Sequence, residues 1–113
     1  MKWIQVGDPI EANAIGRALG KKRSKNTKPL LIGSVKSNIG HAEGCAGIAS
    51  FAKMTLALSN RILHANMNFT KISEKIPAHT FNIKVNSTHH NLPNPEKSLE
   101  KPIIVGVNSF GMV

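Results

Sequence analysis

Residues 30–44 of the chain read Leu30-Leu31-Ile32-Gly33-Ser34-Val35-Lys36-Ser37-Asn38-Ile39-Gly40-His41-Ala42-Glu43-Gly44. The apolar run from Leu30 to Val35 follows Pro29 and predicts a short buried strand. Residues 36–41 predict a polar turn, and we expect a helix from Ala42 to about Ser59. Glycines are costly inside a helix, so the small residues in its first turns indicate close backbone approach or a buried helix. These small residues are Gly44, Cys45, Ala46, Gly47, Ala49 and Ser50.

The turn after this strand carries a lysine and a histidine, Lys36 and His41, five positions apart. Functional sites in α/β folds are usually built where strands end. An imidazole in such a turn can polarise a carbonyl group or transfer a proton, and a nearby ammonium group can hold negative charge or position the imidazole. The alternative is a structural turn with a solvated lysine and a hydrogen-bonded histidine. The spacing alone leaves both interpretations open.

The elements on either side of this stretch predict a mixed α/β fold. A helix is expected over residues 9–19, with Asp8 as its N-cap and Glu11 completing a capping box. Residues 81–85 alternate apolar and polar, which predicts a strand with one exposed face. Residues 103–107 predict a final buried strand. The expected order of elements is helix, strand, helix, strand, strand.

Composition excludes several classes of protein. The 113 residues contain 15 Lys and Arg against 6 Asp and Glu, a net charge of +9, and one Cys. This length fits a single domain over residues 1–113. The lone Cys45 excludes an intrachain disulfide framework and a cysteine-based zinc site, and it is more typical of a buried small residue than of a nucleophile. The adjacent His89 and His90 lack further ligands, so no metal site is expected.

Neither a membrane nor a nucleic acid is an expected partner. No apolar run approaches the roughly 20 residues of a membrane span, and the N-terminus lacks a secretory signal, so we expect a cytoplasmic protein. The basic loop over residues 21–28 invites a nucleic-acid interpretation, but no aromatic residues or nucleic-acid-binding motif accompany it. The loop is interpreted as a solvated surface. A surface that attracts an acidic carrier protein is the alternative.

Four ordered segments resemble β-ketoacyl synthases, the condensing domains of type I fatty acid and polyketide synthases. Residues 33–47 resemble the family's Gly-Ser-Val-Lys-Ser-Asn-Ile-Gly-His-x-Glu-x-x-x-Gly signature. Residues 5–12 resemble the end of its His-Gly-Thr-Gly-Thr-x-x-Gly-Asp-Pro-Ile-Glu-Ala motif. Residues 63–69 resemble its Ile-Pro-Pro-Asn-Leu-Asn-Phe segment, and residues 106–111 its Gly-Val-Ser-Ser-Phe-Gly motif. The resemblance runs from Gln5 to the C-terminus and is weak only around residues 21–28 and 70–100.

This resemblance implies a partial thiolase-like fold with α-β-α layers, the C-terminal half of a ketosynthase domain. It implies decarboxylative Claisen condensation, in which a Cys thiolate takes an acyl chain and two His residues assist the decarboxylation of a malonyl thioester. The implied substrates are acyl and malonyl groups carried on the phosphopantetheine of an acyl carrier protein, with no intrinsic cofactor. The implied partners are the carrier protein, the remainder of the synthase domain and, as in full domains of the family, a second copy.

The resemblance also assigns roles to particular residues. His41 matches the second catalytic His, and Lys36 matches the Lys that supports it. Asp8 and Glu11 match acidic residues of the supporting network, although helix capping alone also explains them. Phe110 matches the Phe that gates the malonyl site, with a simple core ring as the alternative.

Two catalytic groups of the family have no match in this sequence. The nucleophilic Cys belongs to the N-terminal half of the family's domain, and the first catalytic His would precede Met1. We therefore expect an internal piece of a synthase domain, inactive in condensation by itself. The alternative function is a non-catalytic interaction module that binds a carrier protein or another synthase chain.

Overall fold

The chain forms two compact units. The structure is a computed structural model that describes residues 7–24, 26–67, 69–94, 96 and 102–109. The first unit comprises residues 1–33 and 68–86, and the second comprises residues 34–67 and 87–113. The assignment of residues 1–113 to one domain stays a prediction.

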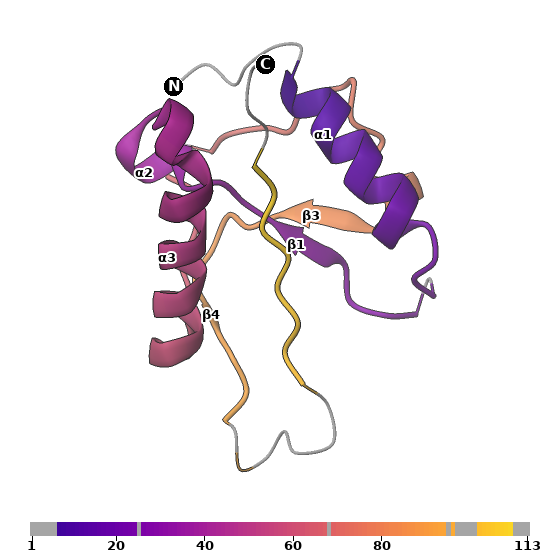
Figure 1. Cartoon of the computed structure of the whole chain (residues 1–113). Helices are drawn as coiled ribbons and strands as arrows, with labels where there is room; N and C mark the ends of the chain where they lie inside the picture. Colours follow the sequence, from indigo (N-terminus) through magenta and orange to yellow (C-terminus); the bar gives the residue numbers. More distant parts are fainter. Residues whose placement is uncertain (1–6, 25, 68, 95, 97–101, 110–113) are drawn as a thin grey trace. The chain divides into compact units, whose positions relative to one another are not determined.

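The first unit contains a parallel pair of strands. Strand β1 (Leu30–Ile32) pairs with β3 (Ile83–Val85), with Leu30 opposite Ile83, and the two strands lie side by side in Figure 1. The helical elements of this unit are α1 (Gly7–Ile15), the π-helical η1 (Gly16–Gly20) and α4 (Ala78–Phe81).

The hydrophobic core of the first unit lies between α1, α4 and β3. Ala12, Ile76, Phe81 and Ile83 are its buried members. Along β3, Ile83 and Val85 are each 4% exposed, whereas Lys84 between them is exposed. The prediction of a strand with one exposed face is therefore confirmed over Ile83–Val85. It is wrong for the first two predicted residues, because Phe81 ends α4 and Asn82 caps that helix. Residues flanking this core are partly buried: Leu30, Ile32, Ile72 and Ala78.

Two glycines in η1 allow α4 to approach closely. A Cβ atom on Gly16 would lie 2.8 Å from Cβ of Phe81, and one on Gly20 would lie 3.0 Å from the carbonyl carbon of Phe81 and still closer to its oxygen. Cβ atoms do not approach other atoms so closely, so larger residues at either position would force Phe81 away. The π-helical turn keeps both glycines buried, with the Lys21 N–H donating to the Gly16 oxygen at 2.7 Å.

The second unit is built around one long helix. Helix α3 (Ala46–Asn60) follows the short helical turns α2 (Lys36–Ile39) and η2 (Glu43–Cys45). It ends at Arg61, which adopts the left-handed conformation at φ 57° and donates its N–H to Ala57 and Leu58. Strand β2 (Ile62–Leu63) then pairs antiparallel with β4 (His90–Asn91).

The structure corrects several predictions from sequence. Residues 36–41 contain the helical turn α2 rather than a non-helical turn, and β1 ends at Ile32 instead of continuing to Val35. Asp8 lies within α1 as its second residue, so it does not precede the helix as a cap. The described residues 103–107 form no strand, and Ile104 is 87% exposed. A strand needs a partner for its backbone groups, and no described strand pairs with this segment.

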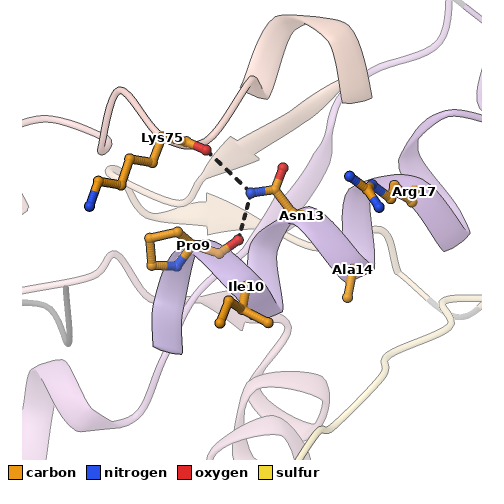
Figure 2. Close-up of a pocket in the computed structure, with 6 residues that line it drawn as sticks. All are labelled: Pro9, Ile10, Asn13, Ala14, Arg17 and Lys75. Carbon is orange, nitrogen blue, oxygen red and sulfur yellow. Dashed lines mark hydrogen bonds between the residues drawn. The ribbon is translucent and has the colours of Figure 1, made fainter. Parts of the chain in front are cut away.

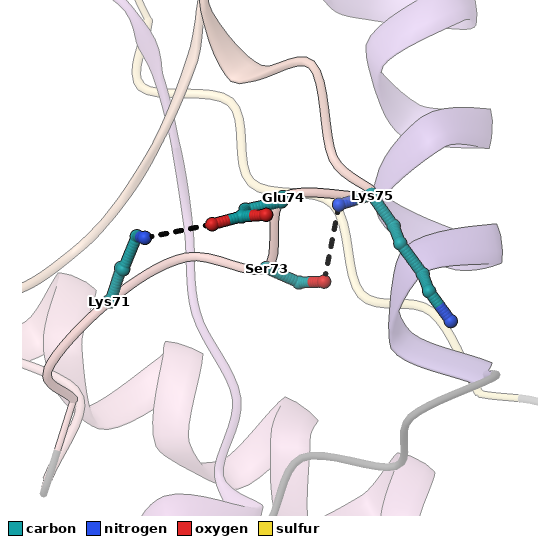
Figure 3. A network of polar contacts seen from close by, with 4 residues as sticks. All are labelled: Lys71, Ser73, Glu74 and Lys75. Carbon is teal, nitrogen blue, oxygen red and sulfur yellow. Dashed lines mark hydrogen bonds and ion pairs between the residues drawn. The ribbon is translucent and has the colours of Figure 1, made fainter.

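Two loop segments of the first unit carry exposed polar side chains. The described residues of the basic loop 21–28 are all exposed, which agrees with a solvated loop. In the turn before α4, Lys71 Nζ lies 3.0 Å from Glu74 Oε1, and the Lys75 N–H donates to Ser73 Oγ at 3.3 Å (Figure 3). Exposed ion pairs of this kind contribute little stability. None of the helices in the described ranges has the length and apolar character needed to cross a membrane.

The close approach of η1 and Phe81 predicts that Gly20→Ala destabilises the chain. The added methyl group overlaps the backbone of Phe81, which cannot rotate away, so we expect the free energy of unfolding to fall by about 1–3 kcal/mol. Urea denaturation followed by circular dichroism measures this loss. Gly44→Ala is the matched control, because a Cβ there meets no atom within 4 Å. Equal stability of the two variants would contradict the packing described.

Candidate functional site

The stretch from Ser34 to His41 is held by a dense set of local hydrogen bonds. The Lys36 N–H donates to Ser34 Oγ at 3.2 Å, and Ser37 Oγ donates to the Ser34 carbonyl oxygen at 2.9 Å. The Gly40 N–H closes α2 on the Lys36 oxygen at 2.9 Å, with Gly40 at φ 78°. Glycine adopts this backbone conformation without steric cost. The chain therefore leaves α2 in a direction that a residue with a Cβ would reach only with strain.

His41 directly follows this glycine, and one of its ring nitrogens is already occupied. Its Nδ1 accepts a hydrogen bond from the Glu43 N–H at 2.9 Å. An accepting Nδ1 carries no proton, so a neutral His41 carries its proton on Nε2. The ring is exposed, and its Nε2–H is available as a donor. Glu43 sits at φ 46°, a strained conformation for a residue with a side chain.

Lys36 begins α2 and is half-buried. Among the described residues its ammonium group has no ion-pair partner. The hydrogen bond to Ser34 Oγ fixes the backbone of Lys36, and the Lys36 ammonium group is available to bind an anion. Lys36 and His41 thus lie on either side of the helical turn α2, where the sequence predicted a polar turn without a helix.

Two residues that sequence reasoning did not single out also contact this stretch. Asn66 is 6% exposed, and its Oδ1 accepts from the Ser34 N–H at 3.1 Å. Lys53 on α3 donates to Asn38 Oδ1 at 3.0 Å and to the Ser34 oxygen at 3.4 Å. Burial lowers the pKa of the Lys53 ammonium group. Nothing in the local pattern distinguishes Lys53 from a solvated helix residue, so only the structure reveals it.

The segment before Phe110 lies against the start of α3. A Cβ atom on Gly47 would lie 3.0 Å from both Cβ and Oγ of Ser109. Within the second unit, the contacts therefore join the described parts of three segments that resemble the synthase family: residues 34–47, 63–67 and 106–109. Phe110 itself lies outside the described residues.

The two predicted acidic residues lie in the first unit. Asp8 and Glu11 are both on α1, and Glu11 is half-buried. An open depression of about 460 Å³ also lies along α1 (Figure 2). At its edge Asn13 Nδ2 donates to the oxygens of Pro9 at 2.7 Å and Lys75 at 3.2 Å. The depression is lined by none of the predicted site residues, so its position is not evidence for their roles.

Metal ligation has little support in the described part of the chain. His64 and His89 meet edge to face with ring centroids 5.2 Å apart, and His89 Nδ1 accepts from the Ala65 N–H at 3.2 Å. No group of three or more His, Cys, Asp or Glu residues gathers there in a way that suits a metal ion.

The hydrogen bond from Glu43 predicts the tautomer of His41. At a pH where imidazoles are neutral, we expect Nδ1 to be unprotonated and Nε2 protonated. Two-dimensional ¹⁵N–¹H NMR of the histidine rings distinguishes the two nitrogens by their chemical shifts. A ring that carries its proton on Nδ1 would contradict the contact with Glu43.

Comparison with known proteins gives a consistent answer. The family described as "Beta-ketoacyl synthase, C-terminal domain" matches residues 4–70. The "Highly reducing polyketide synthase pspA" of Penicillium soppii is 45% identical over 107 residues, which cover 95% of this chain and 4% of that protein. "Polyketide synthase GfsA" of Streptomyces halstedii is 42% identical over 108 residues, which cover 96% of this chain and 1% of that protein. The chain thus spans only a few per cent of the length of these relatives.

A solved structure supports the same assignment at the level of the fold. The "Ketosynthase from module 1 of the bacillaene synthase from Bacillus amyloliquefaciens FZB42" matches with a TM-score of 0.71 and 26% identity. The match covers 80% of this chain and 17% of that one. It confirms the prediction of a partial thiolase-like α/β fold. The chain belongs to the β-ketoacyl synthase family and corresponds to the C-terminal region of a ketosynthase domain.

Proposed function

We propose that this chain supplies the second catalytic histidine and its support to the condensing site of a polyketide or fatty acid ketosynthase. The observation that carries the proposal is the hydrogen bond from the Glu43 N–H to His41 Nδ1. This bond leaves Nε2–H of a neutral imidazole as a fixed donor. Such a donor is what the oxygen of a malonyl thioester needs as it gains negative charge.

The reaction begins with the loss of carbon dioxide from the malonyl group. The bond between the carboxylate and the α-carbon breaks, carbon dioxide leaves, and the electron pair forms an enolate with its charge on the thioester oxygen. The enolate carbon then attacks the carbonyl carbon of an acyl group on a cysteine, and that cysteine leaves as a thiolate. His41 stabilises the enolate oxygen more than the neutral thioester oxygen, so its hydrogen bond lowers the barrier.

The remaining predicted residues take the supporting roles that the family resemblance implies. Lys36, one turn before it, holds negative charge and orients the imidazole. Asp8 and Glu11 belong to the supporting network, and Phe110 gates the malonyl site. The acyl and malonyl groups arrive on the phosphopantetheine of an acyl carrier protein, and no intrinsic cofactor takes part.

Other partners are needed for condensation. The nucleophilic cysteine and the first catalytic histidine come from the remainder of the synthase domain, and the complete domain acts as a homodimer. Cys45 in η2 is exposed, so the expectation of a buried small residue is wrong. Cys45 is not the proposed nucleophile. The 113-residue chain alone therefore carries out no condensation.

His41→Ala tests the proposal in a complete ketosynthase whose corresponding segment is replaced by residues 7–109. Loss of one donor to the enolate oxygen is expected to lower the rate of malonyl decarboxylation by about 10²–10³. Release of carbon dioxide from radiolabelled malonyl carrier protein measures that rate.

His79→Ala is the matched control, because His79 is exposed on α4 and belongs to none of the four family segments. It is expected to leave decarboxylation unchanged. Full activity of His41→Ala would refute the proposal. Stable acylation of the isolated chain by an acyl thioester would refute the statement that the chain alone is inactive.

A second candidate function is a non-catalytic interaction module, favoured by the exposed apolar side of α3. Ile48, Phe51 and Leu56 are 74%, 66% and 62% exposed. Their spacing places them within one side of the helix, opposite the buried Ala57. Exposed apolar side chains that gather on one surface favour association with another protein. In this candidate function, the partner is another synthase chain.

Leu56→Gln tests this second candidate. If α3 buries its apolar side in a partner copy, removing one leucine weakens self-association about tenfold or more. Sedimentation equilibrium of the 113-residue chain measures the association constant. Leu19→Gln is the matched control, because Leu19 is 57% exposed but lies on η1 of the first unit. Equal effects of both substitutions would reject α3 as the interaction surface.

A further inference from the structure

Lys53 is the one residue in the described part of α3 whose charged group reaches back to the stretch that carries Lys36 and His41. Its Nζ lies 3.0 Å from Asn38 Oδ1 and 3.4 Å from the Ser34 carbonyl oxygen. Ser34 stands at the start of that stretch, and Asn38 stands in α2 between Lys36 and His41. A single ammonium group therefore links the helix to both the beginning and the middle of the stretch.

The surroundings of Lys53 argue against an ordinary solvated lysine. Its side chain is half-buried on the same side of α3 as Ala57. Burial disfavours its charged form and lowers its pKa. No carboxylate among the described residues pairs with it. Within the described part of the chain, its charge is offset by two oxygens, Asn38 Oδ1 and the Ser34 carbonyl oxygen, whereas the exposed Lys71 pairs with a carboxylate.

The oxygens that Lys53 binds are themselves part of the local network. The Ser34 carbonyl oxygen also accepts from Ser37 Oγ, and Ser34 Oγ accepts from the Lys36 N–H. The Asn38 N–H donates to the Val35 oxygen at 2.9 Å within α2. Because the Lys53 ammonium group binds both Ser34 and Asn38, it fixes the pitch of the turn between them. The conformation of this turn determines the direction in which the backbone continues from Gly40 to His41.

We propose that Lys53 is a positioning residue that clamps residues 34–38 to α3 and thereby holds Lys36 and His41 in register for catalysis. The role in catalysis rests on the function proposed above. The clamp itself is a property of the chain and can be measured without activity. Lys53 touches no reacting group, so it acts only through Lys36 and His41.

Amide hydrogen exchange in the 113-residue chain tests the clamp. Lys53→Met keeps the apolar part of the side chain and removes the donors. We expect exchange of the Asn38, Ile39 and Gly40 amides to become about tenfold to a hundredfold faster, because hydrogen bonds to a charged donor are lost. Exchange in the last two turns of α3 should stay the same. Lys53→Arg keeps a charged donor and should restore most of the protection.

Lys84→Met serves as the matched control, because Lys84 is exposed on β3 in the first unit. It should leave exchange in α2 unchanged. Equal acceleration along α2 and all of α3 in Lys53→Met would overturn the clamp, since it would show a general loss of stability. Unchanged exchange in α2 would overturn it as well.

The catalytic part of the inference needs the complete ketosynthase that carries residues 7–109. There Lys53→Met should lower kcat of decarboxylation about tenfold with KM for malonyl carrier protein unchanged, and Lys53→Arg should recover it. An unchanged kcat would overturn the positioning role. The His41→Ala variant of the same protein separates the two questions: its full activity would refute the proposed function, while the exchange result would still decide the clamp.

Discussion

The candidate site depends on Ser34, whose N–H, hydroxyl and carbonyl groups all form hydrogen bonds. Its N–H donates to Asn66, its hydroxyl oxygen accepts from Lys36, and its carbonyl oxygen accepts from Ser37 and Lys53. A buried or half-buried backbone group without a partner is costly, so each of these bonds restricts the conformations open to the chain. Segments far apart in sequence meet at this one residue. The hydrogen bonds of Ser34 determine the geometry of the turn that carries Lys36 and His41.

The same arrangement explains why the site stretch tolerates local strain. Glu43 holds a left-handed backbone conformation that a side chain disfavours. Its N–H points to His41 Nδ1, and the helix α3 that begins three residues later anchors the chain. Helical hydrogen bonds along α3 offset the strain at Glu43. The hydrogen bond that fixes the tautomer of the His41 imidazole thus comes from the backbone of Glu43.

Sequence patterns predicted the two longer helices, because helical signals are local. The main part of α1 lies where its apolar spacing placed it, α3 lies within the expected helix after Ala42, and β3 shows the expected alternation at Ile83 and Val85. The prediction for residues 103–107 failed because apolar character signals burial but does not supply a strand partner. The helical turn α2 was missed because Ser34 and Gly40, and not an apolar stripe, determine it. The family motifs identified His41 and Lys36 as candidates. No sequence pattern identified Lys53, because its hydrogen-bond partners Ser34 and Asn38 lie far from it in sequence.

The parallel pairing of β1 with β3 has a consequence for how the chain acquires its structure. Leu30 pairs with Ile83, so the pairing closes a loop of about 50 residues, at an entropic cost of about 3.5 kcal/mol beyond a constant. Helix α3 lies wholly within that loop and forms from local contacts in about a microsecond. A ribosome that adds about 5–20 residues per second needs roughly 3–10 s to reach β3 after it has made β1. During that interval β1 has not yet paired with β3, so a chaperone or another nascent segment has its best opportunity to bind along this edge of β1.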